Sequence, residues 1–454
     1  MFRNSSPGAE RARKYRVYAA LAAATLFVLC MWYFSVHRAS SPSSGSRLTN
    51  LPLSTKTPYL APNTTAPTAL EGLELVQVQY VYRHGARYPT AGDMSHIRDV
   101  YDLEGLSVPH GWINLELVDE SNAALLAQYG YREIAGIAQR TLQRYSEFMA
   151  ERMRHPESVR FVSSEFQRSY VSARTFQSVV DPSNHTKPVT VLPLEDDTIL
   201  AMKKQCPLWT QGKAAATFNA SREVAAFDSI HGQKLRQRMS SKIGVRLDLL
   251  TLENISALYL MCGYEVSLFA RLDTWCSLFD SDTAALMELR NDIKYSRVYG
   301  PFGADINRRM ACALFTTIFQ DIDSALRSVS SATSTFRFGH AETVMFVSTL
   351  LSLEQALGSD NSPITGAMPL ARAQHRGFKT SIIAPFSTNL GIELYRDRRA
   401  QPFFRILLNE QAVRLPECAD AFCSLDVLRN KLGDAIGCDF DRVCHVTKRA
   451  HLSQ

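Results

Sequence analysis

A short run between positions 82 and 90, Tyr-Arg-His-Gly-Ala-Arg-Tyr-Pro-Thr, has the residue types needed to handle a phosphate group. Arg83 and Arg87 flank His84, and the planar fork of arginine matches the oxygens of a phosphoryl group. A neutral imidazole can attack phosphorus and form a covalent intermediate. Gly85 lets the backbone approach the phosphate closely. The run therefore predicts phosphoryl-transfer chemistry with His84 as the nucleophile.

This run resembles the signature of the histidine phosphatase superfamily, in the branch that contains acid phosphatases and phytases. The match covers Arg83, His84, Gly85, Arg87, Pro89 and Thr90. The resemblance implies that Arg83 and Arg87 clamp the phosphate that His84 attacks. Thr90 is implied as a further substrate-binding residue.

Two downstream segments resemble the remaining catalytic elements of that branch. In Ser163–Phe176, Arg168 stands where the family has a third phosphate-binding arginine, and Arg174 is the nearby alternative. His340 and Glu342 belong to a His-Ala-Glu sequence, the pattern of multiple inositol polyphosphate phosphatases, whereas acid phosphatases carry His-Asp. The resemblance implies that His340 donates a hydrogen bond to phosphate and that Glu342 protonates the leaving alkoxide. A nearby phosphate should raise the pKa of Glu342.

The resemblance extends over residues 71–450. It implies a phosphoric monoester hydrolase that acts on inositol polyphosphates such as phytate, with 2,3-bisphosphoglycerate as a further substrate. A broad-specificity acid phosphatase and a catalytically inactive, membrane-tethered binding protein are the alternatives. Selectivity for several phosphates requires additional cations. The candidates are Lys203, Lys204, Lys213 and Arg222.

A strand precedes each of the two key histidines. Leu73–Tyr82 is rich in β-branched and aromatic residues and lacks Gly and Pro, which predicts a strand that ends just before His84. Thr335–Phe338 predicts a second strand before His340. Apolar residues recur at helical spacing in the segments 123–145, 282–294 and 342–357.

These elements predict an α/β fold with its site at the carboxyl ends of strands. The resemblance implies a histidine-phosphatase-like central sheet flanked by helices. We expect the domain to cover residues 71–450, with a core at about 71–189 and 310–450. The stretch 190–309 looks mostly helical and is expected to form a cap inserted into that core.

The N-terminal region predicts a membrane anchor. Residues 17–36 contain no charge and are long enough to cross a bilayer as a helix. Residues 1–16 carry an excess of basic side chains, which favours a cytoplasmic tail. Residues 37–70 are rich in Ser, Thr and Pro and predict a flexible stalk. The catalytic domain would then be lumenal or extracellular, or secreted if the apolar segment is a cleaved signal peptide.

The cysteines and sequons also favour the secretory pathway. Outside the predicted anchor there are eight cysteines, Cys206, Cys262, Cys276, Cys312, Cys418, Cys423, Cys438 and Cys444. An even number favours disulfides in an oxidising compartment. Proximity predicts the pairs Cys262–Cys276, Cys418–Cys423 and Cys438–Cys444, which leaves Cys206–Cys312. The candidate glycosylation sites are Asn63, Asn184, Asn219 and Asn254.

The remaining composition sets limits on ligands. The formal net charge of +6 is mild and suits an anionic small molecule. Nothing resembles a nucleic-acid-binding stripe or a zinc-finger spacing. Arginines fill the cationic role at the predicted site, so no metal and no cofactor are implied. The expected partners are a phosphorylated small molecule and, through residues 17–36, a membrane.

Overall fold

The computed structural model describes residues 51–63, 72–328 and 333–446. The predicted cytoplasmic tail and transmembrane segment, residues 1–36, lie outside the described residues. Within the described ranges, no helix is both long enough and apolar enough to span a bilayer. These described residues form one compact unit.

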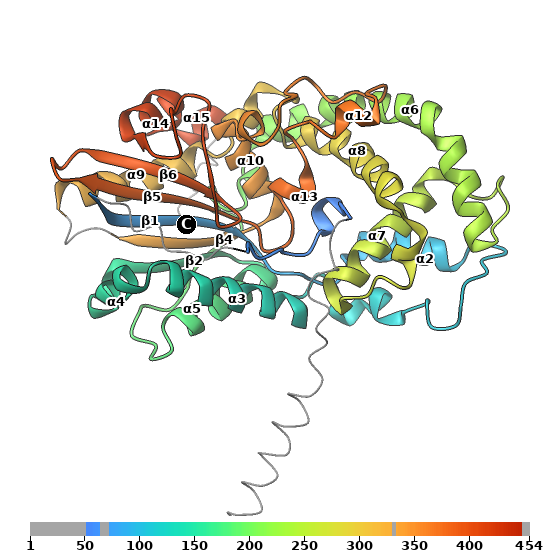
Figure 1. The fold of residues 1–454 in the computed structure, drawn as a ribbon, viewed down its shortest axis with the longest axis horizontal. Coiled ribbons are helices and arrows are strands. Elements are labelled where there is room, and N and C mark those ends of the chain that lie inside the picture. Colours follow the sequence, from blue (N-terminus) through green and yellow to red (C-terminus); the bar gives the residue numbers. More distant parts are fainter. Residues whose placement is uncertain (1–50, 64–71, 329–332, 447–454) are drawn as a thin grey trace, which may run out of the picture. The chain divides into compact units, whose positions relative to one another are not determined.

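One mixed sheet holds the eight strands of the described chain (Figure 1). The spatial order is β3-β2-β4-β1-β5-β6-β7, with β8 beside β6. The pairs β3–β2, β2–β4 and β4–β1 are parallel. The pairs β1–β5, β5–β6, β6–β7 and β6–β8 are antiparallel. The bounds are β1 (Leu73–Arg83), β2 (Val159–Ser164), β3 (Thr190–Leu192), β4 (Ser334–Gly339), β5 (Asn389–Asp397), β6 (Pro402–Leu408), β7 (Gln411–Val413) and β8 (Cys423–Ser424).

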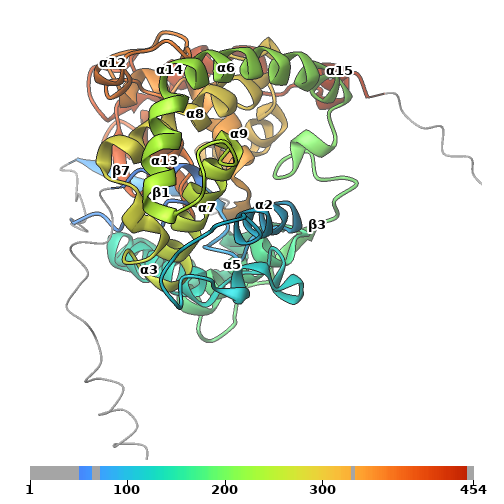
Figure 2. The ribbon, with the colours of Figure 1, turned by 90° about the vertical axis from the view of Figure 1, so that its right-hand side faces the viewer.

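Helices cover both faces of the sheet, as Figures 1 and 2 show. Tyr80 and Tyr82 of β1 pack in a buried cluster with side chains of one helical layer, and Val81 packs in a second cluster with the other layer. The first layer contains α3 (Gln128–Arg144), α4 (Ser146–Arg154) and α5 (Gln167–Val180). The second contains α9 (Cys312–Arg327), α10 (Ala341–Leu351), α14 (Leu425–Leu432) and α15 (Phe440–Cys444). Because both faces are covered, β1 is buried from Val76 to Arg83. The buried side chains of Gln77 and Gln79 donate hydrogen bonds to the Thr333 carbonyl at 2.8 and 2.9 Å.

A group of longer helices lies beside this layered core. It consists of α2 (Ala91–Tyr101), α6 (Pro207–Ile243), α7 (Leu252–Phe269) and α8 (Ser281–Val298). Short helices complete the fold, including α11 (Glu354–Leu357), α12 (Leu370–Ala373), α13 (Thr380–Ile383) and the 3-10 helices η1 (Ser54–Lys56), η5 (Met202–Lys204), η6 (Trp275–Leu278) and η7 (Asp305–Arg308). The segment 190–309 is therefore mainly helical.

The helix expected over 342–357 is interrupted. α10 ends at Leu351, and Ser352 adopts a left-handed conformation with φ of 54°. This conformation stops the helix because it turns the backbone out of the right-handed path. The chain resumes helical geometry only in α11.

Part of the predicted stalk is folded. Residues 51–63, which we call the N-terminal strap, include the buried side chains of Leu53 and Tyr59. Composition predicted flexibility because the segment has too few large apolar residues to fold alone. The strap instead packs against residues far away in sequence, so its order comes from tertiary contacts.

Four disulfides join the cysteines of the described chain. Two of the expected pairs, Cys262–Cys276 and Cys418–Cys423, are present. The other two expected pairs, Cys438–Cys444 and Cys206–Cys312, are wrong, because the bonds are Cys206–Cys444 and Cys312–Cys438. The C-terminal segment folds back over the beginnings of α6 and α9, which brings each of its cysteines to a distant partner. Proximity in sequence therefore predicts the wrong partners for these two disulfides.

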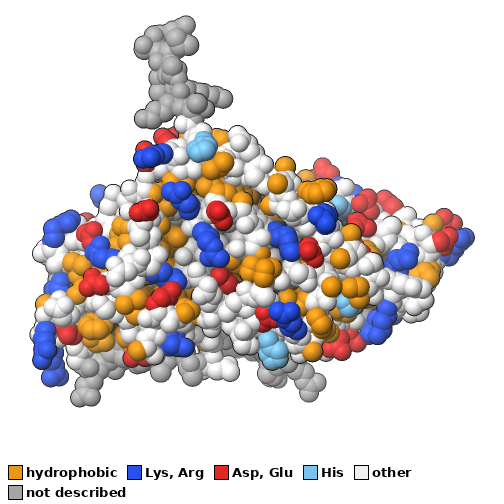
Figure 3. All heavy atoms as spheres, turned by 90° about the horizontal axis from the view of Figure 1, so that it is seen from above, with side chains coloured by type: hydrophobic (Ala, Val, Ile, Leu, Met, Phe, Trp, Pro, Cys, Tyr) orange, Lys and Arg blue, Asp and Glu red, His pale blue; other side chains and the backbone are white. Residues whose placement is uncertain are grey.

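The candidate glycosylation sites differ in exposure. Asn63, Asn184 and Asn219 are exposed, whereas Asn254 is half-buried. The Asn254 side-chain oxygen accepts a hydrogen bond of 2.9 Å from the backbone N–H of Thr251 and so caps α7. On the face shown in Figure 3, basic and acidic side chains are interspersed.

Candidate active site

The two predicted histidine loops meet at the carboxyl ends of neighbouring parallel strands. Arg83 at the end of β1 pairs with Gly339 at the end of β4. The backbone N–H of His84 donates a hydrogen bond of 3.1 Å to the Gly339 carbonyl. The imidazole rings of His84 and His340 have centroids 5.8 Å apart. The sheet thus brings together two motifs separated by about 250 residues of sequence.

His84 is held in a form suited to nucleophilic attack. Its side chain is buried, and its Nδ1 lies 2.8 Å from the carbonyl oxygen of Gly85. Because a carbonyl only accepts, Nδ1 carries the proton and Nε2 keeps its lone pair. Burial, followed by the charges of Arg168 and Arg83, holds the pKa of His84 well below its usual range. The imidazole is therefore neutral at physiological pH.

The loop that carries His84 is locked in place. A Cβ on Gly85 would lie 2.6 Å from the carbonyl oxygen of Gly130, so only glycine lets the loop pack on the start of α3. The Gly85 N–H donates to Ser172 Oγ at 3.1 Å, and the Ala86 N–H donates to Glu133 Oε2 at 2.9 Å. The glycine expected to admit the phosphate thus also provides a close contact between loop and helix.

Arg83 is a buried guanidinium without a carboxylate partner in the described residues. Its Nη1 donates to the carbonyls of Thr55 at 2.6 Å and Ala384 at 2.7 Å, and its guanidinium carbon lies 4.2 Å from the Phe386 ring centroid. Burial and the nearby Arg87 lower the pKa of Arg83 to about 9. A buried cation with no counter-ion is unfavourable, which is typical of a site that receives an anion.

Arg168 is likewise a guanidinium without a carboxylate partner in the described residues. It is in the first turn of α5, with its guanidinium carbon 4.7 Å from the Phe166 ring centroid. Among the described residues it forms no ion pair, and burial together with Arg87 lowers its pKa to about 10. The alternative candidate, Arg174, instead donates a hydrogen bond of 2.7 Å to Gln177 on the same helix. Arg174 is exposed, and it is the charge of Arg168 that acts on His84.

Arg87 is oriented by a small polar network. Its Nη1 donates to Tyr264 Oη at 2.9 Å, and Tyr264 in turn donates to Asp93 Oδ2 at 2.6 Å. Thr90, predicted to bind substrate, caps α2 by accepting a hydrogen bond of 3.1 Å from the Asp93 N–H. Sequence reasoning missed Tyr264 and Asp93, because their roles depend on α2 and α7 lying side by side.

His340 and Glu342 occupy the start of α10. The His340 Nε2 lies 2.9 Å from Ser164 Oγ, and burial lowers its pKa to about 3. Glu342 forms an ion pair with Lys203 of η5. Burial alone would raise the pKa of Glu342, but Lys203 and His340 outweigh it and hold the pKa well below its usual range. The rise of this pKa that a bound phosphate is expected to cause stays a prediction.

The four cap cations separate into two groups. Lys203 and Lys204 line a cavity of about 220 Å³ together with Arg168, His340 and Glu342. The other two lie elsewhere, since Lys213 packs over Trp209 and Arg222 borders a different cavity.

Comparisons with known proteins agree with this geometry. Multiple inositol polyphosphate phosphatase 1 of Gallus gallus is 26% identical over 406 residues, covering 86% of this chain and 88% of that protein. The Homo sapiens protein of the same name is also 26% identical, with 84% of each chain covered. The crystal structure of the phytase from D. castellii matches with a TM-score of 0.70 at 14% identity, covering 87% of this chain and 88% of that one.

A Bifidobacterium longum multiple inositol polyphosphate phosphatase, solved in complex with inositol hexasulfate, matches with a TM-score of 0.66 at 15% identity. It covers 85% of this chain and 98% of that one. Residues 74–409 match the histidine phosphatase superfamily (branch 2). The expected recognition and enzyme class are confirmed: the chain is a phosphoric monoester hydrolase that belongs to branch 2 of the histidine phosphatase superfamily.

Proposed function

We propose that this enzyme removes phosphate from inositol polyphosphates through a phosphohistidine at His84. The observation that carries the mechanism is a buried, neutral imidazole whose Nε2 has no hydrogen-bond partner among the described residues and which is subject to the charges of three arginines, Arg83, Arg87 and Arg168. Two of these guanidiniums lack a carboxylate partner in the described residues, so a phosphate dianion would supply the missing negative charge.

In the first step, His84 Nε2 forms a bond to phosphorus while the bond to the substrate oxygen breaks. Glu342 donates a proton to the departing alkoxide, which is a poor leaving group without it. In the second step, Glu342 takes a proton from water as the water oxygen attacks the phosphohistidine, which releases inorganic phosphate and regenerates the imidazole. His340 and Thr90 are proposed to donate hydrogen bonds to the phosphate oxygens.

Lys203 is proposed to control when Glu342 becomes an acid. Its ammonium pairs with Glu342 and keeps the carboxylate ionised. An arriving phosphate competes for Lys203 and adds negative charge nearby, and both effects raise the pKa of Glu342. The proton donor would thus form only when substrate is bound.

The choice of inositol polyphosphates as substrates rests on the His-Ala-Glu sequence and on the relatives named above. A broad-specificity acid phosphatase is the second candidate, because an acid phosphatase of Schizosaccharomyces pombe is 23% identical over 439 residues. A catalytically inactive binding protein is a poorer proposal, since His84, Glu342 and the three arginines are all present.

The mechanism is tested by substitution of His84. We expect His84→Ala to abolish hydrolysis while the far-UV circular dichroism and the melting temperature stay close to wild type. Wild type quenched during turnover without acid should yield an acid-labile phosphoenzyme that the variant lacks. Substantial turnover by His84→Ala would refute the mechanism.

The substrate class is tested across a salt series with inositol hexakisphosphate and β-glycerophosphate. We expect a higher kcat/KM for the hexakisphosphate at low salt, with the gap shrinking as ionic strength rises, because screening weakens the attraction of a polyanion most. Comparable values at low salt would favour the broad acid phosphatase.

We also propose that the catalytic domain is lumenal or extracellular and is anchored through residues 17–36. The four disulfides support an oxidising compartment. Membranes from cells that express the full chain should retain it after alkaline carbonate extraction, and a chain starting at Ala39 behind a cleavable signal should be released. Release of the full chain would support secretion after signal cleavage.

A further inference from the structure

The N-terminal strap is tied to the catalytic core at several points. The Thr55 carbonyl accepts from Arg83, the Tyr59 N–H donates to Glu133 Oε1 at 2.8 Å, and the Thr57 carbonyl accepts from the Phe386 N–H at 2.9 Å. Two of these partners, Arg83 and Glu133, also hold the His84 loop. The strap is thus part of the wall of the active site.

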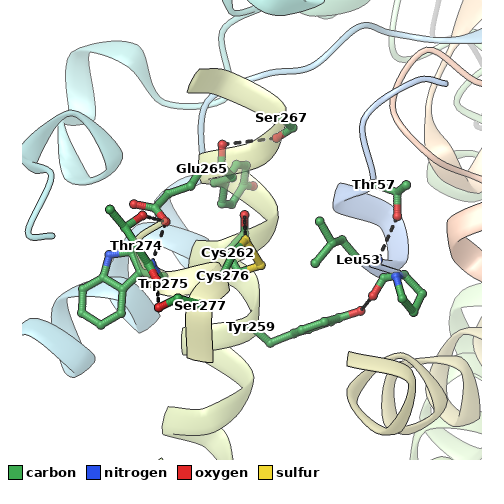
Figure 4. The surroundings of a disulfide bond; sticks show 12 residues. Leu53, Thr57, Tyr259, Cys262, Glu265, Ser267, Thr274, Trp275, Cys276 and Ser277 are labelled. Atoms are coloured by element: carbon green, nitrogen blue, oxygen red, sulfur yellow. Dashed lines mark hydrogen bonds between the residues drawn. A yellow bond between two sulfur atoms is a disulfide. The ribbon is translucent and has the colours of Figure 1, made fainter. Parts of the chain in front are cut away.

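The strap also contacts the helices beside the core. Tyr259 of α7 donates a hydrogen bond to the Pro52 carbonyl, next to the Cys262–Cys276 disulfide (Figure 4). A Cβ on Gly263 would lie 2.6 Å from the Lys56 Cβ, so α7 presses directly on the base of the lysine side chain. Contacts with both α7 and the core fix the position of Lys56.

Lys56 borders a large cavity whose lining includes Thr55 and Asp93, the residues that accept hydrogen bonds from Arg83 and Arg87. This cavity has a volume of about 600 Å³ and is lined by residues of the strap and of α2, α6, α7 and α8. Such a volume is within the range of roughly 300–1,000 Å³ that small-molecule sites have. The Lys56 ammonium lies 5.3 Å from the Tyr264 ring centroid and, among the described residues, forms no hydrogen bond or ion pair.

Most other charges around this cavity are already neutralised. Arg290 forms ion pairs with Asp228 at 2.8 Å and Glu253 at 3.2 Å. Asp93 accepts hydrogen bonds from Arg87 and Tyr264. In the described chain, the cavity therefore presents two lysines without carboxylate partners, Lys56 and Lys294.

The cavity and the catalytic pocket share electrostatic neighbours. Burial and the charges of Arg87 and Arg83 lower the pKa of Lys56 to about 8, while Asp93 and Glu342 act in the opposite direction. Lys56 is thus mainly cationic at neutral and acidic pH. Contacts also link Lys56 to the arginines of the catalytic site. Its ammonium lies over the ring of Tyr264, whose hydroxyl accepts from Arg87, and the carbonyl of the preceding residue, Thr55, accepts from Arg83.

We propose that Lys56 binds a second phosphate of the substrate, distinct from the one that His84 attacks, and that the cavity holds the remainder of a polyphosphorylated molecule. This inference rests on the proposed function and makes Lys56 a specificity residue for it. Lys294, on the exposed rim of the same cavity, contributes a weaker contact because solvent screens its charge.

The test uses the purified full chain and its inhibition by two probes. Hydrolysis of para-nitrophenyl phosphate is inhibited with inorganic phosphate, which needs only the catalytic pocket, and with inositol hexasulfate, which also reaches the second site. We expect Lys56→Gln to raise the inhibition constant of inositol hexasulfate about tenfold, the effect of losing one charge-assisted hydrogen bond. The inhibition constant of inorganic phosphate should change by less than about twofold, because that anion does not reach Lys56.

Two further variants are matched to Lys56→Gln. Lys56→Arg keeps the charge and should keep most of the affinity for inositol hexasulfate. Lys234→Gln removes an exposed lysine of α6 that does not line the cavity, and it should change neither constant. Circular dichroism and melting temperature should show that all variants are folded.

Two results would overturn the inference. One is an unchanged inhibition constant for inositol hexasulfate in Lys56→Gln. The other is an equal rise for both probes, which would place Lys56 in the catalytic pocket itself. Neither result depends on which polyphosphate the enzyme hydrolyses. The proposed function fails separately if the His84→Ala variant still hydrolyses para-nitrophenyl phosphate.

Discussion

Removal of Lys203 should extend the activity of this enzyme toward higher pH. Lys203 pairs with Glu342, and both side chains are 25% exposed. Two unit charges about 4 Å apart interact by roughly 4 kcal/mol at an effective dielectric constant of about 20. Partial exposure reduces this value toward the 0.2–1 kcal/mol of surface pairs. We therefore take about 1.4 kcal/mol, which corresponds to a pKa change of about one unit.

The sign follows from the role proposed for Glu342. Lys203 stabilises the carboxylate and lowers the pKa of Glu342, so its loss raises this pKa. The protonated form is the proton donor, and kcat/KM reports the titration of the free enzyme. In Lys203→Gln, the alkaline limb of kcat/KM should move up by about one pH unit.

The assay is hydrolysis of β-glycerophosphate, which has one phosphate and an alkoxide leaving group. Weaker phosphate binding without Lys203 would lower kcat/KM at every pH and would not move the limb. Lys204→Gln is the matched control, because Lys204 lines the same cavity but forms no ion pair in the described residues. A limb that stays in place or moves down in Lys203→Gln would refute the proposed link between the two side chains.

Three other predictions can be checked directly. Glu342→Gln should slow phytate hydrolysis by about 10²–10⁴-fold and para-nitrophenyl phosphate hydrolysis far less, since nitrophenolate leaves without a proton; equal losses would make Glu342 structural. Gly85→Ala should lower stability by about 1–3 kcal/mol in denaturant titrations and reduce activity, because its Cβ would meet the Gly130 carbonyl; an unaffected variant would show that the loop can relax. Non-reducing peptide mapping should recover the two long-range disulfides, and local pairing within the C-terminal segment would contradict the structure. The expected bonds are Cys206–Cys444 and Cys312–Cys438.

The catalytic pair of loops was predictable because its signals are local. A run of β-branched and aromatic residues followed by Arg83 and His84 specifies both a strand and the residues at its end. The same holds for Thr335–Phe338 and His340. Because parallel strands of one sheet end at the same edge, a local prediction of each strand was enough to place each histidine at a carboxyl end. That the two strands are neighbours was decided by the tertiary structure.

The surroundings of these loops were decided only by tertiary structure. Lys56 belongs to a segment whose composition indicates flexibility, and its order depends on hydrogen bonds to Arg83, Glu133 and Phe386 far along the chain. The pairing of Cys206 with a cysteine 238 residues away likewise depends on where the C-terminal segment packs.

The ionisation of Glu342 was also decided by tertiary structure. Its type and position are visible in the sequence, but its pKa depends on which charges lie beside it, and Lys203 reaches it from a separate element. Sequence alone thus determined the reacting groups and the strands that carry them, because propensity and periodicity are properties of neighbouring residues. Packing of distant segments decided which cations, disulfides and carboxylates surround those groups, because long-range contacts leave no periodic signal in a single sequence.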